Sequence, residues 1–300
     1  ALEKSINVVS IRIAEAIGID VVINYYAKLL KFNNDEKKAR IPRNFSIALG
    51  TLEVSPFEIT RAYAIIANGG RDVIPFAVRY IKDRNGNILE NREQEVNAML
   101  MEKSRGGTIQ IIRPETAQVM ISLMRGVISA GTARHANPGR PVAGKTGTTN
   151  NWKDAWFIGF TANLTTGIWM GYDKMGLSLG TGQAAAGIVA PVWGNYMRAA
   201  LVNDPVMEFP VYAGLQQINV CANSGLLPGP QCREQISEIF IPGFVPDREC
   251  DLCNGENPSY LPSKGPDANI VEGQKKKIRG NIRESKKESI IKNIENDLLQ

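Results

Sequence analysis

Residues 141–149, Pro-Val-Ala-Gly-Lys-Thr-Gly-Thr-Thr, are followed closely by residues 154–160, Asp-Ala-Trp-Phe-Ile-Gly-Phe. The second segment is apolar and rich in strand-favouring residues, so the two segments predict neighbouring strands of a buried sheet. Because side chains alternate between the faces of a strand, we expect Lys145 on the opposite face from Thr146 and Thr148. A cation and hydroxyls along one sheet edge suit a ligand that carries a carboxylate.

The glycines of the K-T-G segment give a second reason to expect ligand binding. Gly144 and Gly147 let the backbone of a ligand approach closely, and free N–H groups of an edge strand can hydrogen-bond an acyl group. A K-T-G triplet alone also occurs by chance in glycine-bearing turns, so it needs support. That support is Ser5-Ile6-Asn7, an S-x-N triplet at the entry of a helix predicted over residues 5–18. Alone, Ser5 would be interpreted as a helix N-cap.

S-x-N followed by K-T-G gives two of the three signatures of the serine β-lactamase and penicillin-binding protein superfamily, whose third is S-x-x-K. Three longer phrases, residues 1–13, 47–70 and 144–172, resemble the transpeptidase domain of class A penicillin-binding proteins, the bifunctional peptidoglycan synthases. The resemblance covers residues 1 to about 200. It implies an α/β (α+β) fold, an antiparallel sheet with helices on both faces, truncated at its amino-terminal side.

The resemblance also implies roles for single residues. Ser5 would relay a proton toward the leaving nitrogen, Asn7 would hydrogen-bond the substrate amide, and Lys145 would supply positive potential and help the relay. Thr146 and Thr148 would bind the terminal carboxylate, and the Thr148 N–H would form half of an oxyanion hole. The site residues that we predict are therefore Ser5, Asn7, Lys145, Thr146, Gly147 and Thr148. The resemblance implies neither a cofactor nor a metal there.

The implied reaction is D-Ala-D-Ala transpeptidation through an acyl-serine, with peptidoglycan stem peptides as substrates and β-lactams as inhibitors. A β-lactamase or D,D-carboxypeptidase would share the same motifs and hydrolyse instead, and a non-catalytic binding module is a further alternative. The resemblance places S-x-x-K a few tens of residues before S-x-N, hence before Ala1. The one match within the chain, Ser289-Ile-Ile-Lys292, follows K-T-G in a charged tail, and we treat it as coincidence.

We therefore expect an inactive fragment of a longer protein. Upstream we expect the nucleophile, a glycosyltransferase domain and a membrane anchor, with the chain in the periplasm or at the outer face of the cytoplasmic membrane. The chain itself has no apolar run of membrane-spanning length. Its 43% hydrophobic content can fill a large core, and its net charge of +5 lies mostly in residues 274–300, which hold eight basic and four acidic residues. This distribution argues against nucleic acid as a partner.

Four cysteines, Cys221, Cys232, Cys250 and Cys253, are spaced C-x10-C-x17-C-x2-C. Four thiolates could hold zinc, but the first interval does not fit a C-x2-C knuckle. For an extracytoplasmic chain we favour disulfides, with Cys221–Cys232 and Cys250–Cys253 as the expected pairs. The one histidine, His135, lies far from this cluster, and we expect it in a surface loop and not as a catalytic base.

We expect a partial transpeptidase domain over residues 1–202, a Cys-, Pro- and Gly-rich appendage over 203–273 and a charged tail over 274–300. Periodicity and capping signals predict helices at 20–33, from Ser55 to Asn68, from Pro114 to about Gly131, and at 186–201. Strands are predicted at 73–81 and 87–90, joined by a hairpin, and at 154–161 and 164–172 beside the K-T-G strand. Residues 91–110 are polar, and we expect an exposed loop there.

Overall fold

The structure, a computed structural model, describes residues 1–174 and 176–253. It divides into two compact units, of which the first is Ala1–Val211 and the second begins at Tyr212. Phe209 is buried against Phe160 of the first unit, with ring centroids 5.7 Å apart. The whole of the predicted tail, and Ser289 and Lys292 with it, lies outside the described residues, so the expected three-part division stays a prediction.

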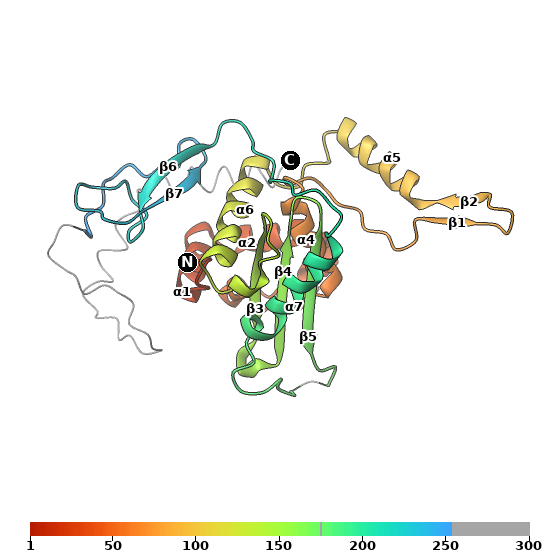
Figure 1. Cartoon of the computed structure of the whole chain (residues 1–300), viewed down its shortest axis with the longest axis horizontal. Coiled ribbons are helices and arrows are strands. Elements are labelled where there is room, and N and C mark those ends of the chain that lie inside the picture. The colour runs from red at the N-terminus through yellow and green to blue at the C-terminus, as the bar shows by residue number, and fades with distance from the viewer. Residues whose placement is uncertain (175, 254–300) are drawn as a thin grey trace. The chain divides into compact units, whose positions relative to one another are not determined.

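A three-stranded antiparallel sheet forms the centre of the first unit (Figure 1). Its strands are β3 (Ala143–Thr148), β4 (Asp154–Phe160) and β5 (Thr165–Gly171), in that order. The K-T-G segment therefore forms the edge strand β3, as the sequence predicts. The register sets Lys145 opposite Ile158 of β4.

Helices cover both faces of this sheet, as the sequence predicts. Phe157 of β4 contacts Trp193 of α7 (Ala185–Ala200) edge-on, with ring centroids 4.9 Å apart. Phe160, three residues further along the alternating strand, faces the other way and meets Tyr63 of α4 (Pro56–Ala67). Helix α6 (Pro114–Ser129) packs against both α4 and β3. The central strand β4 is therefore buried on both faces, which explains its continuous apolar sequence.

The remaining helices of the first unit lie on either side of α4 in sequence. The four that precede it are α1 (Asn7–Ile17), α2 (Ile19–Leu30), α3 (Asn34–Arg40) and the short 3-10 helix η1 (Phe45–Leu49). Two of these, α2 and η1, share with α4 a second core that includes Ile23, Ala27, Leu30, Ile47 and Ala62. Two further short 3-10 helices, η2 (Arg134–Ala136) and η3 (Asn150–Trp152), flank β3 in sequence.

Helix α4 begins with the predicted capping box. Ser55 Oγ accepts a hydrogen bond from the Glu58 N–H at 3.2 Å, and Glu58 Oε2 accepts one from the Ser55 N–H at 2.8 Å. The Arg40 guanidinium also donates to both Glu58 oxygens, at 2.6 and 3.0 Å. This pair ties the end of α3 to the start of α4. The hydrogen bond from Arg40 lowers the pKa of Glu58 to about 2, against the partial burial that raises it.

The prediction of an exposed loop at residues 91–110 is wrong, because residues Arg92–Arg105 form helix α5. Asn91 caps its first turn by accepting a hydrogen bond from the Gln94 N–H at 3.1 Å. Acidic residues in the first turn and basic residues in the last turn complement the helix dipole. Val96 alone among its residues is buried, so the apolar periodicity that marks most helices is missing.

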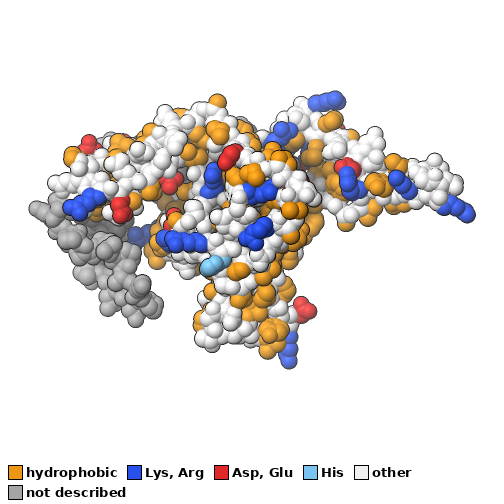
Figure 2. Space-filling model, viewed as in Figure 1, with side chains coloured by type: hydrophobic (Ala, Val, Ile, Leu, Met, Phe, Trp, Pro, Cys, Tyr) orange, Lys and Arg blue, Asp and Glu red, His pale blue; other side chains and the backbone are white. Residues whose placement is uncertain are grey.

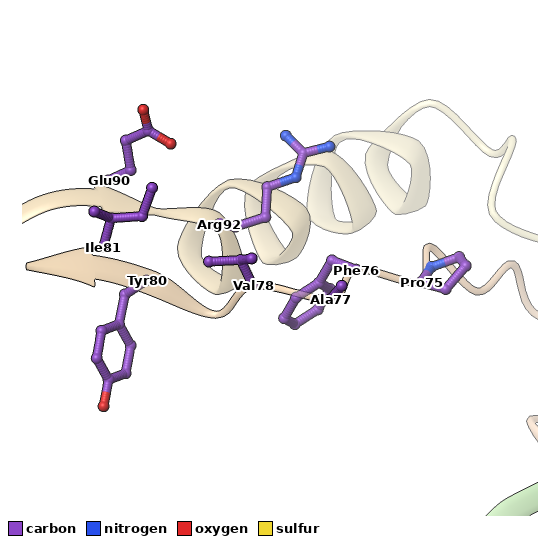
Figure 3. A pocket seen from close by; sticks show the side chains of 8 residues that line it. All are labelled: Pro75, Phe76, Ala77, Val78, Tyr80, Ile81, Glu90 and Arg92. Atoms are coloured by element: carbon purple, nitrogen blue, oxygen red, sulfur yellow. The ribbon is translucent and has the colours of Figure 1, made fainter.

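The strand predicted at residues 73–81 begins only at β1 (Tyr80–Lys82), which pairs with β2 (Ile88–Asn91) as the predicted hairpin. The preceding segment contains Pro75, which has no N–H for a strand ladder. Pro75 and the exposed apolar side chains that follow it, such as Phe76 and Val78, line a hollow of about 410 Å³ beside the hairpin (Figure 3).

The second unit holds a two-stranded antiparallel sheet of β6 (Gln216–Cys221) and β7 (Gln235–Phe240). The disulfides expected for Cys221–Cys232 and Cys250–Cys253 are not formed, and all four thiols are free. The physical reason is that the four sulfurs converge on one point, all within 4.8 Å of one another, and do not separate into two pairs.

Among the described residues, the helices are too short or too polar to cross a bilayer.

The capping pair at α4 predicts a pH-dependent contribution to stability. The pKa of Glu58 lies below its ordinary value of 4.5, so its stabilisation is complete above pH 4.5 and is lost as pH falls toward about 2. We expect Glu58→Gln to lower the melting temperature at pH 6, and the gap from wild type to shrink in acid. Thermal unfolding against pH measures this, with the exposed Glu53→Gln as control. A gap that stays constant from pH 6 to 2.5 would contradict the assignment.

Candidate active site

The two sequence motifs meet at one edge of the sheet. Lys145 Nζ, on β3, donates a hydrogen bond to Ser5 Oγ at 2.9 Å, although 140 residues separate them. Among the described residues this is the one hydrogen bond that joins the S-x-N and K-T-G triplets. Asn7 is the first residue of α1 and its side chain is exposed.

Ser5 is placed by a tight turn that precedes α1. The Ser5 N–H donates to the Leu2 carbonyl at 3.2 Å, and Ser5 itself has a positive φ of 56°. Two contacts attach this turn to the end of α6. Lys4 Nζ donates to the Ala130 carbonyl at 2.8 Å, and the Thr132 N–H donates to the Glu3 carbonyl at 3.3 Å. The position of Ser5 therefore depends on the residues that follow α6.

Gly131 makes this attachment possible. A Cβ at this position would lie 2.5 Å from the Glu3 carbonyl oxygen and 2.7 Å from Val127 Cα. Both are backbone atoms that cannot move aside without shifting a whole segment. The absence of a side chain at Gly131 thus lets the Ala1–Ser5 turn approach the loop between α6 and β3.

Lys145 is half-buried, and its ammonium group contacts more than Ser5. Its Nζ donates to the Thr146 carbonyl at 3.0 Å and lies 3.4 Å from Thr146 Oγ1. Strand alternation predicts the two side chains on opposite faces, but β3 is an edge strand and the flexible lysine stem reaches around it. Burial lowers the pKa of Lys145, so the amine gives up its proton more readily than an exposed lysine does.

The hydroxyls of the K-T-G segment already have protein partners. Thr146 Oγ1 lies 3.1 Å from Thr132 Oγ1, and Thr148 Oγ1 accepts a hydrogen bond from the Ala185 N–H at 3.0 Å. That second bond caps the start of α7. Because the Thr148 hydroxyl accepts there, its proton remains free to donate to a ligand. Thr148 is exposed, which leaves it accessible to such a ligand.

Asp154 organises the turn that follows β3, a role the sequence analysis missed. Its backbone N–H donates to Thr149 Oγ1 at 2.8 Å, and its carboxylate accepts from Thr149 Oγ1 at 3.1 Å and from Trp169 Nε1 at 3.0 Å. These bonds hold the exposed end of the K-T-G strand against β4 and β5. Its position just after the K-T-G segment was the available signal, but the contact with Trp169 depends on the sheet register.

Two features of the surface lie apart from the motifs. His135, the chain's one histidine, is exposed in η2, as predicted, and the pale blue side chain in Figure 2 is at the surface. The hollow beside the hairpin is lined by none of the predicted site residues. The site is therefore an open sheet edge with a half-buried cation, and not the hollow beside the hairpin.

Comparison with protein-family models places this chain in a known family. The model described as "Penicillin binding protein transpeptidase domain" matches residues 1–192. That is more than half of the chain, and the match contains both triplets. The chain belongs to the penicillin-binding protein transpeptidase family. A second model, "Penicillin-binding protein 1A, C-terminal domain", matches residues 211–254 and so corresponds to the described part of the second unit.

Curated relatives agree with this family. The chain is 32% identical over 255 residues to penicillin-binding protein 1A of Aquifex aeolicus, covering 85% of this chain and 32% of that protein. It is 38% identical over 207 residues to penicillin-binding protein 1A of Neisseria lactamica, covering 68% of this chain and 24% of that protein. The chain thus spans about a quarter to a third of the length of these relatives.

Comparison with solved structures supports the fold. The crystal structure of penicillin-binding protein 1A from Haemophilus influenzae matches with a TM-score of 0.69 at 28% identity. The match covers 83% of this chain and 40% of that one. The fold class predicted from the sequence, a penicillin-binding protein transpeptidase fold with an antiparallel sheet, is confirmed.

The close packing at Gly131 predicts a strong effect of one methyl group. We expect Gly131→Ala to lower stability by about 1–3 kcal/mol, because the added Cβ meets backbone atoms that can move only with their segments. Gly126→Ala is the matched control within α6. There the atoms nearest to the Cβ belong to the flexible Glu3 side chain, with a carboxylate oxygen at 3.3 Å, and alanine is the better helix former. Denaturant unfolding compares the two variants, and equal stabilities would contradict this packing.

The bond between the triplets predicts a shift in the pKa of Lys145. Ser5 Oγ accepts from the ammonium form, so Ser5→Ala removes a group that favours the charge. We expect the pKa of Lys145, already lowered by burial, to fall further. The pH dependence of Lys145 acetylation, followed by peptide mass spectrometry, measures this shift. Ser10→Ala, on the helix α1 that follows Ser5, serves as control. An unchanged or higher pKa in Ser5→Ala would show that the bond is not formed.

Proposed function

We propose that this chain carries the S-x-N and K-T-G parts of a D-Ala-D-Ala transpeptidase site that cross-links peptidoglycan. The observation that carries the proposal is the 2.9 Å hydrogen bond from Lys145 to Ser5 at the edge of the β3–β4–β5 sheet. It brings a cation of lowered pKa and a hydroxyl together beside an edge strand. These groups suit proton transfer to a leaving nitrogen and binding of a carboxylate.

The reaction is an acyl transfer in two balanced steps. A serine Oγ attacks the carbonyl carbon between the two terminal D-alanines, the C–N bond breaks, and D-alanine leaves with the serine proton. The acyl group is then held as a serine ester. An amine of a neighbouring stem peptide attacks this ester, the C–O bond breaks, an amide forms, and the proton of the amine returns to the serine.

Two residues of the site move protons in this scheme, and a third holds the substrate. Lys145 holds a half-buried amine whose lowered pKa favours proton transfer. Ser5, its hydrogen-bond partner, passes the proton toward the leaving nitrogen. Asn7, exposed on the first turn of α1, hydrogen-bonds the substrate amide next to the reacting carbonyl.

The edge strand binds and orients the acyl donor. The Thr146 and Thr148 hydroxyls receive the terminal carboxylate, and the free proton of Thr148 supports this role. Gly147 presents no side chain to a ligand backbone beside β3. A Cβ there would also crowd Trp156 of the neighbouring strand, at 3.3 Å from its Cβ. The Thr148 N–H supplies one oxyanion donor, and the attacking serine's own N–H supplies the other.

The attacking serine of the whole protein belongs, in this proposal, to an S-x-x-K tetrad encoded ahead of Ser5. The one S-x-x-K match within these 300 residues, Ser289-Ile-Ile-Lys292, follows K-T-G in sequence order and lies outside the described residues. We further propose that the whole protein also polymerises glycan chains and acts outside the cytoplasm, anchored by a membrane segment. The names of its relatives, penicillin-binding protein 1A, support β-lactams as inhibitors of this site.

Labelling with a fluorescent penicillin tests the acyl-serine proposal, with the 300-residue chain compared with the full-length encoded protein. We expect only the full-length protein to label. Lys145→Ala in that protein should slow labelling by about 10²- to 10⁴-fold, the range typical of general acid–base groups. Lys153→Ala, an exposed lysine close by in the β3–β4 connection, is the matched control.

Three outcomes would contradict parts of the proposal. If the 300-residue chain itself labels, Ser289 or another internal serine must be the nucleophile. Absence of labelling in both would favour a non-catalytic binding module. Labelling followed by release of free acid, with no transfer to an amine acceptor, would favour a hydrolase of the β-lactamase or D,D-carboxypeptidase type.

A further inference from the structure

The four cysteines of the second unit form a cluster that the transpeptidase proposal does not use. All four sulfur atoms lie within 4.8 Å of one another. Cys253 Sγ lies 3.6 Å from Cys221 Sγ and 3.6 Å from Cys250 Sγ. Four sulfurs bound tetrahedrally at about 2.3 Å from a zinc ion are themselves about 3.8 Å apart. The two 3.6 Å separations are close to this value, and the other sulfurs lie within about 1 Å above it or nearer.

The backbone brings these cysteines together from separate segments. Cys221 ends strand β6, and its N–H donates to the Leu226 carbonyl at 2.8 Å. The Cys250 N–H donates to the adjoining Leu227 carbonyl, also at 2.8 Å. Cys232 lies in a turn of its own, where its N–H donates at 3.0 Å to the carbonyl three residues earlier. The cluster is thus set by backbone pairing and does not depend on side-chain rotation alone.

The cluster is also the core of this unit. Among the described residues from Tyr212 to Cys253, three of the five buried ones are cysteines, and the buried set is Val220, Cys221, Gly229, Cys232 and Cys250. A two-stranded sheet of this kind is marginally stable in water, and chains of about 40 residues usually need disulfides or a metal. Without a cross-link of the thiols, too little apolar surface is buried to hold the two strands together.

We propose that Cys221, Cys232, Cys250 and Cys253 bind one structural Zn²⁺ ion. Soft thiolate ligands in tetrahedral arrangement select zinc, and four protein ligands leave no open position for catalysis. Binding displaces the thiol protons and changes no oxidation state, so no oxidant is required. The alternative that we favoured from the sequence, two disulfides, requires two separate pairs, whereas the sulfurs share one centre.

The surroundings of Cys253 fit this assignment. Cys253 is the least buried of the four, and Asn223 Nδ2 approaches its sulfur at 3.9 Å. An amide donor beside a thiolate spreads the negative charge of a tetrathiolate site and orients the ligand. The C-x2-C spacing of Cys250 and Cys253 is the spacing found in zinc knuckles. The long interval from Cys221 to Cys232 is bridged by the turn after β6.

Metal content and thiol state of the full-length protein test the proposal directly. We expect one zinc per chain by inductively coupled plasma mass spectrometry. Alkylation under denaturing, non-reducing conditions with chelator should modify all four thiols. Replacement of zinc by Co²⁺ should give the visible absorption of a tetrahedral tetrathiolate site. Two disulfides in the purified protein would overturn the proposal, as would four free thiols that bind neither Zn²⁺ nor Co²⁺.

Single substitutions assign the ligands. Cys→Ser at each of the four positions should weaken Zn²⁺ binding in chelator competition by more than the roughly 10- to 100-fold typical of losing a supporting group. Ser237→Ala, on the exposed face of β7, is the matched control and should bind zinc as wild type does. In the wild-type protein, chelator should speed proteolysis between Tyr212 and Cys253, which tests the structural role without any variant. Wild-type affinity in all four variants, or unchanged proteolysis, would overturn the proposal.

Discussion

The bond between Lys145 and Ser5 is the contact on which the site depends. It joins the edge strand of the sheet to the turn ahead of α1, and so turns two distant triplets into one group of polar side chains. The bond forms because Gly131, which has no side chain, lets the backbone of that turn contact the backbone at the end of α6. Loss of this approach would leave the lysine and the hydroxyls intact in the sequence but separate in space.

The position of β3 at a sheet edge gives the site its chemistry. An interior strand would have neighbours on both sides, whereas the edge leaves room for the Lys145 stem to curl around the backbone. Partial burial lowers the pKa of this amine, and contact with the Thr146 carbonyl and Ser5 hydroxyl keeps it in place. In the proposed function, the same edge receives the acyl donor as an added strand. Positioning, charge and access thus follow from one feature of the fold.

Strong local patterns made much of the fold predictable from the sequence. The capping box at Ser55 and the apolar run of β4 predicted their elements, because each pattern reports burial or capping directly. The sequence analysis missed helix α5 because its polar residues bury almost nothing. It placed the start of β1 too early because periodicity does not register the N–H that Pro75 lacks. Within the site, the triplets were found through family resemblance. The role of Asp154, like the convergence of the cysteines, arises only from tertiary contacts that spacing does not encode.

A crystal structure of the full-length protein after reaction with penicillin tests the central claim most directly. The account predicts an ester on a serine of an S-x-x-K tetrad, with the drug's carboxylate on the Thr146 and Thr148 hydroxyls and Lys145 still bonded to Ser5. An ester on a serine remote from this edge would contradict it. A carboxylate bound away from β3 would do the same, since the cation and hydroxyls of the K-T-G strand would then have no part in recognition.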